Sequence, residues 1–411
     1  MNNPFTSQTF VKIWMKHFGG SNSVIVFDNL KEVKFYKPKY LPFYINVGKN
    51  LTKGIGYNYE GDSPSLKGKA LLIYDVPEYF DIKPLKSKRY KLKKIFQYRG
   101  FLMNISDFEN TEQYIKKQFS SKNRREFRSN ERRLNICFDI SYKFYHGDIS
   151  KTDYDFVFKH FYRLLNIRFS GKNINYHHLN PKKWDYYKAL VYPLIQEKKA
   201  SLLVVYDSGI PIGITLNFHS DKILFETITV FDIDYYKFSI GKQSILKLLD
   251  WCFENNYEIS DFSKGKFDYK YKWSNLVYDF HYHIIYDSFS LWSRFVAKLL
   301  ESFFKLKLFL RTHHFNVLYR KFLYKVGESP KKTEIKQRYK VQKLEAFELD
   351  SSYQKIDLKS QKYSFLKHPI YTYLFAKPEP IENIKVYENL NSEKKFVMIG
   401  ENQQLLIEFD C

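Results

Sequence analysis

The stretch that decides the fold runs from Leu224 to Ser274 and reads LFETITVFDIDYYKFSIGKQSILKLLDWCFENNYEISDFSKGKFDYKYKWS. Residues 223 to 230 are rich in β-branched and aromatic side chains, which predicts a strand. Apolar residues then recur with the spacing of one helical face, at Ile245, Leu248, Leu249 and Cys252. A pair of asparagines at 255 to 256 ends that helix, and residues 259 to 262 predict a second strand. The stretch therefore predicts a strand, a turn, a helix and another strand.

The turn before the helix, Ser239-Ile240-Gly241-Lys242, offers a place for an anion. Unpaired backbone N–H groups and the positive end of the helix dipole meet at a helix N-terminus. Gly241 allows the backbone to approach a pyrophosphate closely, and Ser239 adds a hydroxyl donor. An ordinary helix start has the same local pattern, so the turn alone does not decide between the two interpretations.

The end of the stretch carries a further motif, from Asp261 to Trp273, which reads DFSKGKFDYKYKW. With the order of elements before it, this motif resembles the core of the GNAT acyltransferases. The resemblance is strongest to the CelD-like branch, the cellulose-biosynthesis-type acetyltransferases, which is related to the Fem-type tandem GNAT proteins. In that branch a strand ends in a small-x-Gly turn, a helix follows, and the next strand carries Asp-Phe-x-x-Gly-x-x-x-Tyr-Lys-x-x-Trp.

The composition is that of a globular protein with room for two domains. The chain has 411 residues, of which 44% are hydrophobic and 19% aromatic, so it has ample apolar surface to bury. Lysine and arginine total 67 against 44 acidic residues, a formal net charge of +23. This excess favours anionic partners, although a genome biased toward A and T would encode a similar composition by default.

Three cysteines, odd in number and without metal-ligand spacing, indicate a reducing cytosol. The N-terminal residues contain no apolar segment of the kind a secretory signal needs. The sequence contains no run of 18 apolar residues, so it predicts no transmembrane helix. We expect a cytoplasmic protein, with a peripheral position at the inner face of the membrane as an open alternative.

We predict an α/β protein with a mixed sheet, built from tandem GNAT-like domains and a basic helical and small β C-terminal extension. The first half predicts a helix at 5–18 and strands at 23–27, 40–47, 71–74 and 96–105. The expected boundaries are a degenerate N-terminal GNAT-like domain at 1–109, a basic junction helix at 110–135, a C-terminal GNAT acyltransferase domain at 136–288, basic amphipathic helices at 289–327 and a tail with a small β appendage at 328–411.

The second half follows the GNAT order of elements. It predicts a strand at 137–145, helices at 153–165 and 180–197, a hairpin of strands at 201–206 and 212–218, the stretch above, and a last strand at 277–286. Residues 290–326 predict helices that are both basic and apolar, suited to docking on the second domain or to an anionic membrane surface. The tail predicts strands at 371–375, 384–387, 396–399 and 405–409.

The junction helix carries a stripe of basic residues on one face. Arg124, Arg128 and Arg132 lie four residues apart. They are suited to phosphate or tRNA contacts, and a solvated face interleaved with glutamates is the alternative.

The resemblance implies acyl transfer from a thioester to an amine, with acetyl-CoA or another acyl-CoA as co-substrate. Such a reaction needs a held donor, a base for the incoming ammonium and an acid for the departing thiolate. The base candidate Glu226 shares a strand face, by the period of two, with Leu224, Ile228 and Val230. Burial of that face would raise the pKa of Glu226 toward that of a useful base, whereas an exposed carboxylate paired with a lysine is the alternative.

Tyr269 stands where the resemblance places a residue near the thiol end of the donor, and a phenol can protonate a thiolate. It is equally suited to an aromatic core. Lys270 is a candidate anion contact, and Asp261 would orient that lysine or the loop backbone. His281 and His283 alternate in the last strand but lack a third ligand, so no metal is expected.

The resemblance implies an N-acyltransferase whose acceptor is a small-molecule amine, such as a sugar or a cell-envelope or exopolysaccharide precursor. The widespread GNAT phosphate loop has an arginine or glutamine and two small residues, of which only the shortened turn from Ser239 to Lys242 is present here. Two alternatives therefore stay open. One is a Fem-type transferase that uses aminoacyl-tRNA, and the other is a non-catalytic GNAT-like binding module.

Overall fold

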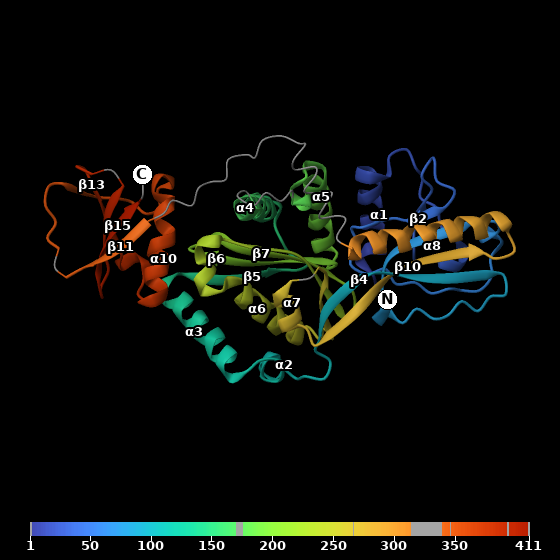
Figure 1. The fold of residues 1–411 in the computed structure, drawn as a ribbon, viewed down its shortest axis with the longest axis horizontal. Coiled ribbons are helices and arrows are strands. Elements are labelled where there is room, and N and C mark those ends of the chain that lie inside the picture. The colour runs from blue at the N-terminus through green and yellow to red at the C-terminus, as the bar shows by residue number, and fades with distance from the viewer. Residues whose placement is uncertain are drawn as a thin grey trace.

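The computed structural model describes residues 2–169, 176–265, 267–313, 339–345, 347–392 and 394–409. Its centre is a ten-stranded mixed sheet with the order β1-β2-β3-β10-β4-β9-β8-β7-β6-β5 (Figure 1). The strands are β1 (Phe35–Tyr36), β2 (Tyr44–Asn46), β3 (Ala70–Pro77), β4 (Tyr90–Asn104), β5 (Ile140–Tyr145), β6 (Ala200–Asp207), β7 (Ile210–His219), β8 (Ile223–Phe231), β9 (Ile259–Lys264) and β10 (Leu276–Asp287).

The two halves of the chain share this sheet through β10. This strand ends the second half in sequence, yet it pairs antiparallel with β3 on one side and with β4 on the other. β4 in turn pairs antiparallel with β9, which joins the halves a second time. The predicted fold class, a mixed α/β fold with two successive halves and a small C-terminal sheet, is confirmed.

Helices cover both faces of the second half. α4 (Lys151–Phe169) and α5 (Pro181–Gln196) lie on one face, and α6 (Ile240–Glu254) lies on the other (Figure 1). α4 buries a stripe at the spacing of helical turns, made of Tyr154, Val157, Phe158, Phe161, Leu164 and Leu165. α6 buries Ile245, Leu248, Leu249 and Cys252, as its sequence pattern predicts. In the first half, α1 (Gln8–Trp14) is capped by Ser7, whose side chain accepts a hydrogen bond from the Phe10 N–H.

The predicted junction helix is two helices, α2 (Thr111–Gln118) and α3 (Ser121–Cys137). The break lies at Phe119, which is buried, and at Ser120, whose side chain caps α3 by accepting a hydrogen bond from the Asn123 N–H. Of the predicted strand at 23–27, only an isolated bridge between Ile25 and Phe35 is present.

The C-terminal extension forms a second, five-stranded sheet with the order β11-β15-β14-β13-β12. Its strands are β11 (Tyr339–Leu344), β12 (Tyr353–Lys355), β13 (Lys385–Asn389), β14 (Lys395–Ile399) and β15 (Gln404–Phe409). The predicted strand at 371–375 is wrong, because this segment belongs to the helix α10 (Lys367–Ala376). There, packing of Ile370 and Leu374 in the core overrides the β propensity of the neighbouring aromatic residues.

α10 attaches this small sheet to the second half. It packs on η7, a 3₁₀ helix at Ile233–Phe238, where the rings of Tyr371 and Tyr235 meet edge to face. A further long helix, α8 (Leu291–Thr312), lies along the first half, on β10 and its neighbours (Figure 1). The part of the predicted helical region beyond residue 313 lies outside the described residues. In the described ranges no helix has the length and apolar character needed to cross a membrane.

Candidate active site

Two parallel strands, β8 and β9, stop pairing in the middle of the sheet. Their register covers only Ile223 to Phe225 on β8 and Ile259 to Asp261 on β9. Beyond this point β8 remains paired with β7, and β9 remains paired with β4. The segments that follow the two strands, η7 with α6 and then α7 (Asp268–Trp273), therefore begin at the carboxyl ends of diverging strands. Ligands of α/β proteins bind at such an edge.

A β-bulge in β8 sets the direction of Glu226. Glu226 pairs with Asn217 of β7, but the next pair is Ile228 with Leu216, which leaves Thr227 as the extra residue. Leu224 packs with the α6 residues, whereas Ile228 and Val230 belong to the core beneath α4 and α5. The prediction that Glu226 shares its face with Ile228 and Val230 is therefore wrong, because the bulge reverses the alternation. Glu226 lies on the α6 side.

Glu226 is nonetheless buried, with 8% of its surface exposed. Its Oε1 atom has no hydrogen-bond partner in the part of the chain that the structure describes. Burial raises the pKa of Glu226 to about 8, an effect that the charge of Lys270 opposes and that of Asp261 adds to. The burial expected of this carboxylate is present, and its catalytic role stays a prediction.

Lys270 lies in α7 and fills the place just beyond β9. Its Nζ atom donates hydrogen bonds to the carbonyl oxygens of Phe262, at 2.6 Å, and Lys264, at 2.7 Å. Burial lowers the pKa of Lys270 to about 8, and the nearby carboxylates Glu226 and Asp261 counteract that effect. Lys270 is thus first a structural cation that holds the end of β9, and one N–H remains for a ligand.

Tyr269 precedes Lys270 on α7 and is 42% exposed. Its ring packs edge to face against Phe262, and it stacks on Phe267. Desolvation raises the pKa of the Tyr269 phenol, the charge of Glu226 raises it further, and Arg168 lowers it. Glu226, Tyr269 and Lys270, predicted separately from the sequence, therefore interact electrostatically at one place.

Asp261 ties this place to the first half of the chain. Its buried carboxylate accepts hydrogen bonds from the Tyr278 hydroxyl at 2.6 Å, the Tyr79 hydroxyl at 2.9 Å and the Ser263 N–H at 2.6 Å. Burial raises the pKa of Asp261 to about 6, although these donors lower it. Asp261 therefore orients the loop backbone, as predicted. Sequence reasoning missed Tyr79, because nothing local marks a tyrosine 182 residues away as a partner.

The predicted phosphate turn has a specific conformation at the start of α6. Ser239 is left-handed, with φ of +60°, and its side chain makes no capping bond to the helix; its Oγ instead accepts a hydrogen bond from Asn130 of α3 at 3.2 Å. Ile240 is fully buried, so only its backbone N–H can serve a ligand. Lys242 forms an ion pair of 2.7 Å with Glu126 of α3. A side chain at Gly241 would place its Cβ 2.8 Å from the ring of Phe231.

Arg168 is a residue of this region that the sequence analysis did not single out. It lies in the last turn of α4, and its guanidinium lies over the ring of Phe231, 4.5 Å from the ring centre. The Nη1 atom is buried and has no hydrogen-bond partner within the described ranges. Burial lowers the pKa of Arg168, and Tyr176 and Tyr269 raise it. The only signal in the sequence is a basic residue in the last turn of a helix, which is common.

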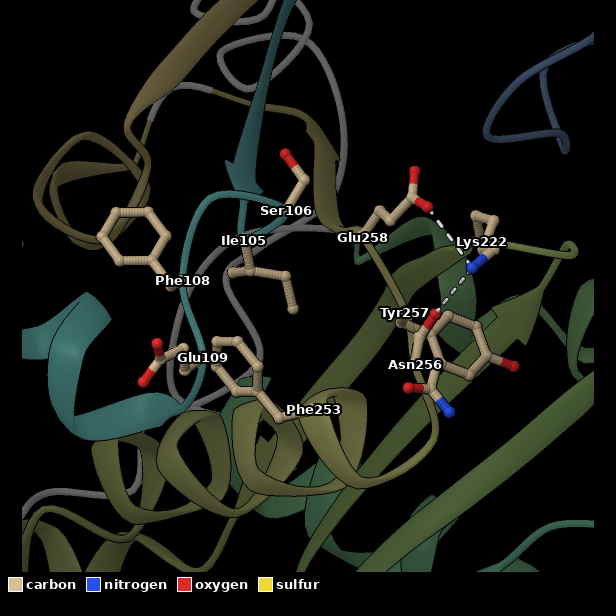
Figure 2. Close-up of a pocket in the computed structure, with 9 residues that line it drawn as sticks. All are labelled: Ile105, Ser106, Phe108, Glu109, Lys222, Phe253, Asn256, Tyr257 and Glu258. Atoms are coloured by element: carbon tan, nitrogen blue, oxygen red, sulfur yellow. Dashed lines mark hydrogen bonds and ion pairs between the residues drawn. The ribbon is translucent and has the colours of Figure 1, made fainter.

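A shallow pocket of about 260 Å³ lies elsewhere, before the first residues of β9. Figure 2 shows Lys222 between Glu258, its ion-pair partner at 3.3 Å, and the carbonyl oxygen of Asn256. Lys222 and Glu258 precede the amino ends of β8 and β9, whereas Glu226 lies just past the point where the two strands stop pairing and Lys270 follows the carboxyl end of β9. We assign no catalytic role to this pocket.

The predicted histidine pair has no metal-binding geometry around it. His283 is buried and shares a hydrogen bond of 2.7 Å with the hydroxyl of Tyr57. Burial lowers the pKa of His283 to about 3. The described residues contain no group of three or more side chains arranged to hold a metal ion.

Comparison with known families gives one match, between residues 121–271 and the acetyltransferase (GNAT) domain. No curated protein matches the chain. Similar solved structures include FemX, with 11% identity and a TM-score of 0.47 over 68% of this chain and 91% of that one. Another is the C-terminal domain of a putative lysylphosphatidylglycerol synthetase from Agrobacterium fabrum, with 11% identity and a TM-score of 0.43 over 72% of this chain and 93% of that one. A third is the PaiA N-acetyltransferase from Thermoplasma acidophilum in complex with coenzyme A, with 12% identity and a TM-score of 0.27 over 35% of this chain and 98% of that one. Likeness at this level carries no argument about substrate.

Proposed function

We propose, from the match of residues 121–271 to the acetyltransferase (GNAT) domain, that the protein is an N-acyltransferase that moves an acyl group, most simply acetyl, from acyl-CoA to an amine. The observation that carries the proposal is the buried carboxylate of Glu226 at the point where β8 and β9 part, whose Oε1 atom has no hydrogen-bond partner among the described residues. The acceptor we propose is a small amine such as a sugar or a cell-envelope or exopolysaccharide precursor. On the motif from Asp261 to Trp273, we further propose membership of the CelD-like branch.

The reaction needs a neutral amine as the nucleophile. Glu226 in its ionised form removes a proton from the bound ammonium, and its pKa of about 8 suits an acceptor near neutral pH. The amine nitrogen then attacks the thioester carbonyl, the C–N bond forms, the C–S bond breaks, and the nitrogen loses its second proton to solvent to give the neutral amide. The Tyr269 phenol supplies a proton to the departing thiolate and recovers it from solvent, since Tyr269 is partly exposed.

The backbone of β8 adds a donor for the developing oxyanion. Thr227 has no partner in the pairing of β8 with β7, so its N–H is a candidate to bind the thioester carbonyl oxygen. A donor fixed in a buried strand needs no reorganisation when charge develops in the transition state.

The donor's phosphates fit the start of α6 only in part. The backbone N–H groups of Ile240 and Gly241 and the positive end of the helix favour an anion, and the half-buried Arg168 lies on the ring of Phe231, which separates it from this turn. Asp232 and Asp234 precede the turn, and burial together with the charge of Asp232 raises the pKa of Asp234 to about 6. These acids disfavour a long polyphosphate contact along η7.

A second candidate is a transferase that takes its acyl group from aminoacyl-tRNA. Two acids of α3 are engaged by α6, because Glu126 pairs with Lys242 and Glu131 pairs with Lys247. Arg128 and Arg132 of the same helix are exposed and form no ion pair within the described residues. An exposed, unneutralised arginine stripe suits a phosphate backbone.

Titration by calorimetry separates the candidates. We expect acetyl-CoA to bind and to remain bound at about 0.2 M salt, whereas tRNA binding is weak and fades there, because a contact with many phosphates has a steep salt dependence. Binding that prefers aminoacylated over uncharged tRNA, with no response to acetyl-CoA, would transfer the assignment to the second candidate. Binding of neither donor would favour a non-catalytic module.

A further inference from the structure

α8 packs one side on the sheet and leaves an apolar side uncovered. The inward side carries Val296, Ala297, Leu300 and Phe304, and the Phe304 ring stacks on Tyr282 of β10 at 3.9 Å. This contact accounts for the attachment of α8 to the first half. It uses only part of the helix surface.

A second apolar line runs along the outer side of α8. It consists of residues spaced three or four apart, here called the α8 stripe, namely Trp292, Phe295, Leu299, Phe303, Leu306 and Leu310. Each member of the stripe is at least 40% exposed. Phe289, Leu291 and Phe309, also exposed, widen the patch. A contiguous patch of large apolar side chains on a protein surface marks an interaction site.

Basic side chains flank the α8 stripe. Arg294 and Lys298 are exposed and form no ion pair in the ranges that the structure describes. Glu301, the acid of α8, is turned toward the sheet and is neutralised by Lys93 and by Lys305. The outer surface of the helix is therefore apolar and cationic, without a compensating acid.

We propose that the α8 stripe docks on an anionic membrane surface, with the helix lying in the plane of the interface. Tryptophan, phenylalanine and leucine beside basic residues are typical of interfacial helices, in which apolar side chains enter the acyl boundary and cations meet the headgroups. A second copy of this chain is a poorer occupant, because two such faces would bring uncompensated cations together in a molecule with a net charge of +23. α8 does not cross the bilayer, since its inner side is held by the sheet.

Co-sedimentation with vesicles tests the proposal without reference to the enzymatic activity. We expect the protein to bind vesicles of mixed phosphatidylcholine and phosphatidylglycerol, and to bind vesicles of phosphatidylcholine alone weakly. The double variant Phe295→Glu/Leu299→Glu should lose at least about tenfold in partitioning. Val341→Glu/Leu390→Glu, which places the same two charges at exposed apolar residues in and beside the small C-terminal sheet, is the matched control and should bind normally.

A second variant tests the role of charge. Arg294→Gln/Lys298→Gln should weaken binding to anionic vesicles by about fivefold for each charge removed, and leave binding to neutral vesicles unchanged. Equal vesicle binding by wild type and Phe295→Glu/Leu299→Glu would overturn the proposal. A wild-type protein that does not bind anionic vesicles would overturn it too. A dimer in light scattering that the same double variant dissociates, without vesicle binding, would assign the α8 stripe to a second copy and overturn it as well.

Discussion

Glu226 and Lys270 lie close enough for each to change the pKa of the other, and burial brings both pKa values to about 8 from opposite sides. The two groups do not form an ion pair in the structure, because the lysine is held by the carbonyl oxygens of Phe262 and Lys264. Glu226 therefore stays available for a proton from a ligand. This arrangement leads to the first two predictions.

The first prediction concerns turnover. Glu226→Gln removes the proposed base and keeps the shape, so we expect a loss of about 10²-fold or more in kcat with donor affinity unchanged. Steady-state rates and calorimetry on the same preparation measure the two quantities. Glu258→Gln, a carboxylate at the amino end of β9, is the matched control and should retain full activity.

The second prediction concerns stability as a function of pH. Burial raises the Glu226 pKa from its ordinary 4.5 to about 8, so the unfolded state releases this proton first as the pH rises. The resulting loss of folding free energy is absent below about pH 4.5. It grows up to about pH 8, by at most roughly 1.4 kcal/mol for each pH unit. Glu226→Gln should therefore unfold at a higher temperature than wild type at pH 8 and at nearly the same temperature at pH 4.5. A constant difference across this range would mean that the carboxylate is not desolvated.

The third prediction concerns Tyr269. Tyr269→Phe keeps the ring contact with Phe262 and removes the proton donor, so turnover should fall by about 10²-fold while donor binding stays intact. Tyr271→Phe, an exposed tyrosine of the same helix, serves as control. If both Tyr269→Phe and Glu226→Gln cost less than about threefold, the protein relies on positioning alone.

The fourth prediction tests the start of α6. Gly241→Glu places a side chain and a negative charge where the donor's phosphates would lie, so binding of acetyl-CoA should disappear. Gly241→Ala is the control for packing, because its Cβ already requires the Phe231 ring to move. We expect the alanine variant to bind with moderately reduced affinity. Unchanged affinity of a folded Gly241→Glu protein would place the donor elsewhere.

The fifth prediction concerns the proposed N-terminal domain at 1–109. In the fold, β10 lies between β3 and β4, so this fragment would lack the strand that connects its own two longest strands. We expect the isolated fragment to show no cooperative thermal unfolding by circular dichroism, in contrast to the full chain. Well-dispersed amide NMR signals from the fragment would instead establish an independent domain.

The sequence predicted the local elements of the site well, because β8, α6 and β9 each carry a clear periodic pattern. It could not predict the bulge at Thr227, since alternation of apolar residues continues through that position and only the partner strand reveals the extra residue. The contact of Tyr79 with Asp261 and the position of β10 depend on pairing between distant segments, which leaves no local signal. At 371–375 the aromatic residues suggested a strand, and only their packing shows a helix.

The position of β10 also restricts how the molecule can move. A clamp-like opening of the two halves would break the hydrogen bonds on one side of β10, or those between β4 and β9, at a cost of about 1 kcal/mol for each bond. Hinge motion of the two halves around a ligand would therefore have to break these hydrogen bonds. Acceptor and donor therefore meet at strands whose relative positions are set before either one binds.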